Sequence, residues 1–66
     1  MQIFLNGETL DLNPGATVLD LIHQQGLAKQ RLAVEVNQHL VPRSQFAASP
    51  LAPGDRVEII HAVGGG

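Results

Sequence analysis

The sequence predicts a small α+β domain of two layers, in which one main helix packs on one face of a mixed sheet of 4–5 strands. Three observations predict it: short runs of alternating apolar and polar residues, one segment with helical spacing between them, and glycine-containing turns that separate the runs. The 66 residues form one domain with a thin core. A chain of this length buries only about 60% of the surface that it exposes when unfolded.

The first predicted element is a hairpin. Residues 1–6 form an apolar run, and Asn6-Gly7 is a pair that favours a type I′ turn because both residues tolerate a positive φ. The alternating run over 8–12 follows as the second strand. Phe4 is expected on the face of the sheet that points away from the core. The side chains expected on the core face are Ile3, Leu5, Leu10 and Leu12.

A short helix is predicted over residues 18–25, after a turn. Thr17 and Asp20 have the spacing of a capping box, with Asp20 in place of the longer Glu. Gly26 suits the position that follows the last helical residues. The apolar stripe that repeats at i, i+3 and i+4 consists of Val18, Leu21 and Ile22.

The second half of the chain contains the remaining strands. One helical turn is expected over 43–49, with Phe46 in the core, and a loop is expected over 50–55. A hairpin, a crossover helix and a last strand that returns to the middle of the sheet describe a β-grasp. The predicted strands cover 32–36, 39–41 and 56–62.

The segment after the last strand is Val63-Gly64-Gly65-Gly66. Glycine loses much conformational entropy inside a helix or strand, so three glycines favour a thin, extended segment outside the fold. One interpretation is a tail that enters a narrow channel of another protein and presents the Gly66 carboxylate. The other is a frayed terminus. We therefore expect a β-grasp domain over 1–63 and a flexible C-terminal glycine tail over 64–66.

The composition of the chain argues against nucleic-acid binding, membrane insertion and metal binding. Net charge is −2, with 4 basic and 6 acidic residues, which gives no basic patch for nucleic acid. The chain has no cysteine and no apolar stretch near the roughly 20 residues that cross a bilayer, so we expect a cytoplasmic protein without membrane contact. A thin core leaves little room for an enclosed active site. His23, His39 and His61 lack metal-ligand spacing, and no metal is expected.

Three stretches resemble the ubiquitin-like sulfur-carrier family, and within it the ThiS family of thiamine biosynthesis. They are the strand that ends in Asn6-Gly7, the segment from Val34-Glu35-Val36-Asn37 to Leu40-Val41-Pro42-Arg43, and the segment from Pro53-Gly54-Asp55-Arg56 to the glycine tail. Together they span nearly the whole chain. Phe46 stands where the family often has Trp, and the tail has three glycines where two would suffice.

The resemblance implies a sulfur carrier for the thiazole of thiamine, acted on by partners and not itself an enzyme. By this resemblance, an adenylating (E1-like) enzyme would use ATP to activate the Gly66 carboxylate, a persulfide donor would supply sulfur, and the resulting thiocarboxylate would deliver it to thiazole synthase. The chain itself is expected to bind no cofactor.

Gly66 is therefore the expected carrier site. Ile60 is predicted to share the open sheet face with Phe4, which suggests an apolar docking patch. The other tail residues expected to contact partners are Ala62, Val63, Gly64 and Gly65. Three alternatives stay open: a sulfur carrier for molybdopterin synthesis, a ubiquitin-like protein modifier, and an interaction domain with an inert tail.

Overall fold

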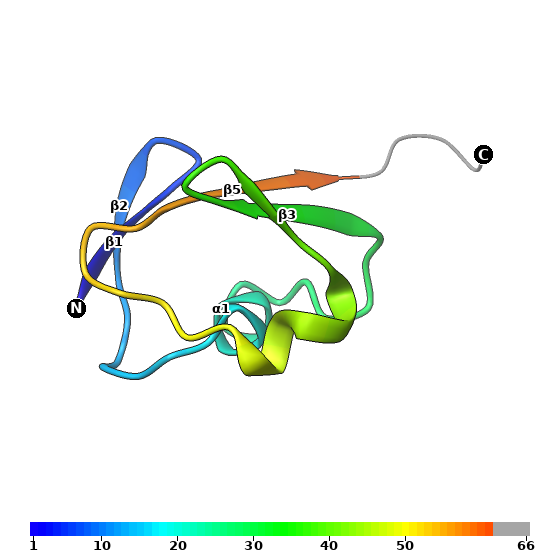
Figure 1. Cartoon of the computed structure of the whole chain (residues 1–66), viewed down its shortest axis with the longest axis horizontal. Helices are drawn as coiled ribbons and strands as arrows, with labels where there is room; N and C mark the ends of the chain where they lie inside the picture. The colour runs from blue at the N-terminus through cyan, green and yellow to red at the C-terminus, as the bar shows by residue number, and fades with distance from the viewer. Residues whose placement is uncertain (62–66) are drawn as a thin grey trace.

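The computed structural model describes residues 1–61 and has two layers, a five-stranded sheet and a helical layer below it in Figure 1. The strand order is β2-β1-β5-β3-β4, so the last strand of the chain lies in the middle of the sheet. This is the predicted β-grasp topology. The expected boundary between 63 and 64, and every prediction for residues 62–66, lies outside the described residues.

The strands follow the predicted runs closely. β1 pairs with β5 in parallel, whereas the pairs β1–β2, β3–β4 and β3–β5 are antiparallel. The bounds are Gln2–Leu5 for β1, Glu8–Asp11 for β2, Leu32–Val36 for β3, His39–Val41 for β4 and Arg56–His61 for β5.

The predicted hairpin turn is confirmed at Asn6 and Gly7, whose φ angles are 50 and 84. A side chain at Gly7 would be strained in this backbone conformation. The register places Ile3 opposite Leu10, whereas Leu5 lies opposite Glu8 and not opposite a leucine. β2 ends one residue before the predicted limit, and Leu12 is buried just beyond it, where its amide donates to the Met1 carbonyl at 2.7 Å.

Helix α1 covers Val18–Gln24 and begins with the predicted capping box. The Thr17 hydroxyl accepts from the Asp20 amide at 3.2 Å, and the Asp20 carboxylate accepts from the Thr17 amide at 2.9 Å. The helix ends one residue earlier than predicted, at Gln24, and Gly26 follows with a φ of 72. Two orphan amides at the helix start are therefore satisfied reciprocally.

The predicted helical turn is a 3₁₀ helix, η1, over Arg43–Ala48, and its Phe46 is buried as expected. The following segment is more ordered than a predicted loop implies. Leu51 is buried there, and its amide donates to the Ala16 carbonyl at 2.8 Å. The Val18 amide donates to the Ser49 carbonyl at 2.9 Å, which ties this segment to the start of α1.

The core lies between α1, η1 and one face of the sheet. Among residues 1–61 it contains no buried polar or charged residue. No helix in this part of the chain is long and apolar enough to cross a membrane. The core residues are Ile3, Leu12, Ala16, Val18, Leu21, Ile22, Val34, Phe46, Leu51, Val57 and Ile59.

The capping box predicts a pH-dependent stability difference. The Thr17 amide that donates to the Asp20 carboxylate lowers the pKa of that carboxyl below its ordinary value in the folded state. The stabilisation is therefore fully present above the unfolded-state pKa of about 4 and is lost as pH falls through the lower folded-state pKa. Asp20→Asn should be less stable than the wild type at neutral pH, and the difference should shrink on acidification below pH ~4.

Urea unfolding followed by far-ultraviolet circular dichroism measures this difference, since the chain has no Trp or Tyr for fluorescence. Glu8→Gln, which removes an exposed carboxylate from β2, is the control for a change of one charge. The difference in unfolding free energy between Asp20→Asn and the wild type should depend on pH. A difference that stays constant from neutral pH to acid would contradict the lowered pKa of Asp20.

Candidate functional site

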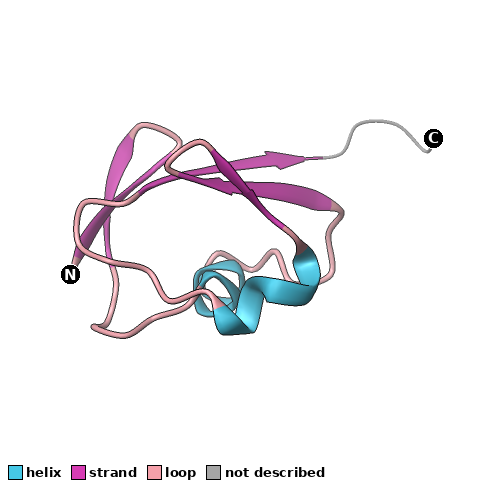
Figure 2. Ribbon diagram, in the orientation of Figure 1, coloured by secondary structure: helices cyan, strands magenta, loops and turns pink. Residues whose placement is uncertain are grey.

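The candidate site is the end of β5, because this strand leads into the glycine tail. β5 lies between β1 and β3, and its Val57 and Ile59 point into the core. Figure 2 shows both helices on one side of the sheet, so the opposite side, here called the open face, carries the outward side chains. Because β1 and β5 are parallel, β5 ends at the side of the sheet opposite the start of β1.

Three polar side chains hold β5 in place. Asn6 Oδ1 accepts from the Ile59 amide at 2.9 Å, at the point where β1 has turned away from β5. Asn37 Oδ1 accepts from the Arg56 amide at 3.0 Å, and Asn37 Nδ2 donates to Asp55 Oδ1 at 3.1 Å. The strand that bears the tail is therefore fixed at its start and beyond its middle by side chains from two turns.

Both asparagines combine two properties. Asn6 and Asn37 each have a φ of 50, a left-handed conformation that Asn tolerates better than most residues. Each also has an amide oxygen that reaches the backbone of β5. The sequence indicates the turn through Asn6-Gly7, but it does not indicate the second role, which depends on how β1 and β5 are aligned.

The open face carries both residues of the predicted docking patch, but they do not form one apolar surface. Phe4 is partly buried and pairs across the sheet with Arg56, whose Cζ lies 5.1 Å from the ring centroid. Arg56 and then Glu58 precede Ile60 along this face of β5. The expectation that Ile60 and Phe4 share the open face is confirmed, and the charged Arg56 and Glu58 lie between them. The expected role of both residues in docking stays a prediction.

Two large apolar side chains are exposed on the open face, and one of them, Ile60, lies near the end of β5. Ile60 is 51% exposed and pairs with Ala33 of β3. Leu40 is 66% exposed and pairs with Glu35, which lies two residues from Ala33 on the same face. Exposed large apolar side chains on one sheet face are a candidate contact surface.

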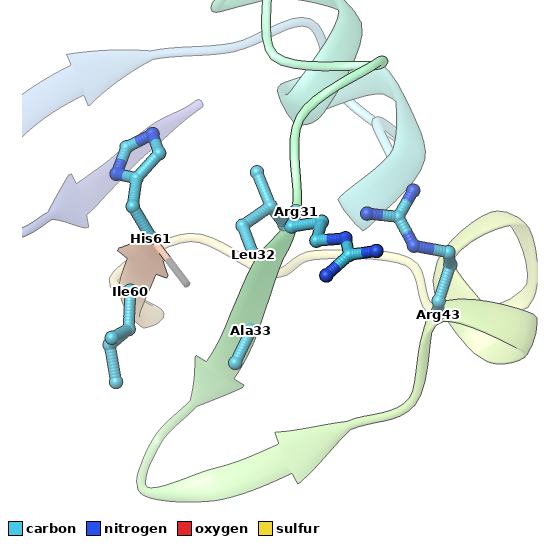
Figure 3. A pocket seen from close by; sticks show the side chains of 6 residues that line it. All are labelled: Arg31, Leu32, Ala33, Arg43, Ile60 and His61. Carbon is cyan, nitrogen blue, oxygen red and sulfur yellow. The ribbon is translucent and has the colours of Figure 1, made fainter. Parts of the chain in front are cut away.

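A shallow hollow of about 300 Å³ lies at the end of β5. Figure 3 shows Ile60 and His61 pointing to opposite sides of the strand, with the side chains of Arg31 and Arg43 beyond β3. The described residues that line the hollow are Arg31, Leu32, Ala33, Arg43, Ile60 and His61.

Among residues 1–61, the end of β5 borders an open hollow and not an enclosed reaction chamber. Catalytic side chains usually sit in clefts that shield them from water. His23, His39 and His61 lie on α1, β4 and β5, and residues 1–61 contain no group of three His, Asp or Glu side chains placed to hold a metal ion. The predicted tail contacts at Ala62 to Gly66 lie outside the described residues and stay predictions.

Comparison with known proteins places the chain among sulfur carriers. The model of the ThiS family matches residues 3–66. The chain is 32% identical to the sulfur carrier protein ThiS of Escherichia coli and covers the full length of both proteins. It is 38% identical to a thiazole synthase of Magnetococcus marinus over 66 residues. This chain spans only 20% of the length of that relative, and 20% of the length of a similar thiazole synthase of Paramagnetospirillum magneticum.

A solved structure agrees with the fold. The crystal structure of the thiamine biosynthesis protein (ThiS) from Geobacter metallireducens superimposes with a TM-score of 0.83 at 28% identity, and the match covers 100% of both chains.

The hydrogen bond from Ile59 to Asn6 predicts a local effect on β5. Asn6→Gly keeps the tolerance for a positive φ but removes the acceptor oxygen. We expect faster hydrogen exchange at the Ile59 amide, and a loss of about 0.5–1.5 kcal/mol of unfolding free energy. Asn6→Asp keeps both the oxygen and the backbone tolerance, so it is the matched control. Equal Ile59 protection in Asn6→Gly and the wild type would contradict the proposed role of Asn6.

Proposed function

Because the chain belongs to the ThiS family, we propose that it is a sulfur carrier for the thiazole ring of thiamine. The main support is the full-length match to the E. coli sulfur carrier, together with a central strand that leads into Val63-Gly64-Gly65-Gly66. In this proposal the folded domain is the part that partner enzymes bind, and the reacting atoms belong to the last residue. The catalytic groups belong to partner enzymes.

The proposed chemistry begins at the Gly66 carboxylate. A carboxylate is a poor electrophile because its negative charge is delocalised. In the active site of an adenylating enzyme, a carboxylate oxygen attacks the α-phosphate of ATP, pyrophosphate leaves, and an acyl-adenylate forms. The terminal sulfur of a persulfide then attacks the acyl carbon and AMP leaves. A thiol then attacks the donor's sulfur in the acyl disulfide that results, which leaves a thiocarboxylate on Gly66 and a disulfide between the donor and that thiol. A second thiol reduces this disulfide and releases the donor's thiol.

Thiazole synthase is the proposed acceptor of that sulfur. Two relatives named thiazole synthase contain a segment similar to the whole of this chain, which supports a functional connection between the two activities. The five residues from Ala62 to Gly66 reach at most about 17 Å when extended, at 3.3–3.6 Å per residue. This length suits a carboxylate that must enter the interior of two different enzymes while the domain stays outside.

The test of this function is direct mass measurement of the chain after incubation with the host's candidate adenylating enzyme, ATP and a persulfide donor. We expect a species whose mass corresponds to replacement of one oxygen by sulfur, located on the C-terminal residue by fragmentation. Deletion of Gly66 is the matched control, since it preserves a glycine carboxylate but shortens the reach by about 3.5 Å. Adducts to lysines of other proteins would instead identify a modifier, and no modification at all would overturn the proposal.

The open face around Ile60, at the end of β5, is the proposed docking surface for the adenylating enzyme. Ile60→Asp should weaken binding at least about tenfold, because a charge replaces a half-exposed apolar anchor close to the tail. Phe4 is a poorer site for this test, since it is partly buried beneath Arg56. Gln24→Glu, on an exposed position of α1, adds the same charge in the helical layer.

Isothermal titration calorimetry measures both affinities. Equal binding by Ile60→Asp and Gln24→Glu would contradict the docking surface while leaving the sulfur chemistry open to its own test.

A further inference from the structure

The charged residues of this chain are unevenly distributed around the sheet. Lys29 lies in the turn before β3, Arg31 directly precedes β3, and Arg43 begins η1. These three residues are here called the basic end. β3 begins opposite the end of β5, and Arg31 and Arg43 line the hollow there together with His61. The acidic residues lie elsewhere: Glu8 and Asp11 on β2, Asp20 on α1, Asp55 before β5, and Glu35 and Glu58 paired across the middle of the sheet.

Arg43 is held in place without being neutralised. Its guanidinium donates to the Gln30 carbonyl at 2.8 Å, and its Cζ lies 5.6 Å from the centroid of the Phe46 ring. Neither partner is an anion, and no carboxylate among residues 1–61 lies within ion-pair distance of Arg43. A guanidinium with one N–H engaged keeps several donors for a carboxylate. Because its side chain is already ordered, little conformational entropy is lost when it binds one.

The hollow beside Arg43 combines apolar and basic groups. Leu32, Ala33 and Ile60 supply its apolar lining, and the lining residues of the described chain include two arginines but no acidic residue (Figure 3). A Glu or Asp side chain fits this combination, because its aliphatic part meets apolar atoms while its carboxylate meets a guanidinium. Charge complementarity therefore favours an acidic surface as the occupant.

The position of the hollow favours acidic protein side chains over the ATP phosphates as the anions that it binds. Gly66 is five residues beyond His61, and an extended tail of that length reaches about 17 Å. In the proposed function the Gly66 carboxylate meets the ATP phosphates, so the basic end would lie about that distance away from them. The groups that meet Arg43 would then be side chains of the adenylating enzyme.

We propose that the hollow and the basic end form a docking site for acidic side chains that surround the entrance of the tail slot on the adenylating enzyme. This inference rests on the proposed function and adds a specific electrostatic contact to it. Its role is to orient the domain so that the tail begins at the slot. Charges at the edge of an interface chiefly raise the association rate, and salt screens their effect.

The experiment measures association of the full chain with the adenylating enzyme by stopped flow at low and at high salt. The test variant is Arg31→Gln combined with Arg43→Gln, which lowers the net charge by two. Its matched control is Asn13→Asp combined with Gln24→Glu, which makes the same change at exposed positions in the turn before α1 and on α1 itself. Circular dichroism confirms that each variant is folded, and Arg31→Gln alone leaves the Arg43 contacts intact.

We expect the test variant to associate at least about tenfold more slowly at low salt, with the gap closing at high salt. The association rate of the control variant at low salt should fall much less.

Equal association rates for the test and control variants would overturn the inference. The proposed function would still be supported if the wild-type chain is adenylated. A slow association that salt does not change would also overturn it, since the contact would then not be electrostatic. Absence of wild-type binding or adenylation would overturn the proposed function, and the docking site with it.

Discussion

Burial of one helical stripe against the central strands is the interaction on which the rest of this structure depends. Val18, Leu21 and Ile22 of α1 belong to the same apolar cluster as Val34 of β3 and Val57 of β5. Each such side chain contributes roughly 1.5–3 kcal/mol when it is fully removed from water. The chain has no cysteine and therefore no disulfide, so a short helix that would be marginal alone is stable only through this packing.

The same packing decides what the domain presents to partners. Once Val57 and Ile59 face the helices, the alternation of a strand places Arg56, Glu58 and Ile60 on the open face. The tail consequently leaves from a strand that is paired on both sides at its start and anchored in the core. In the proposed function, a partner that engages the open face near Ile60 meets the end of β5 at a defined position, which lowers the entropic cost of binding.

Local patterns in the sequence were sufficient for most of the fold. Alternation placed the strands, and the Asn6-Gly7 turn and the Thr17–Asp20 cap were recognisable because each depends on residues close together in the chain. Pairings between distant segments were not recognisable in the same way. The contact of Arg56 with Phe4 and the hydrogen bond from Ile59 to Asn6 require the parallel register of β1 and β5.

The candidate site was only partly predictable for the same reason. Ile60 follows from alternation within one strand, but the hollow beside it is assembled from three segments that no local pattern connects. Leu51 was also missed as a core residue, because an isolated Leu between two prolines has no periodicity to indicate burial.

The central place of β5 also has a consequence for how the chain folds. The β1–β2 and β3–β4 hairpins each form from neighbouring residues, but neither contacts the other directly in the sheet order. The two hairpins join into one sheet only through β5. Its Arg56 pairs with Phe4 across more than fifty residues of sequence. Such long-range closure slows folding and makes it cooperative. During synthesis, the two hairpins keep exposed edges until β5 emerges, and the sheet becomes continuous only when the tail-bearing strand inserts between them.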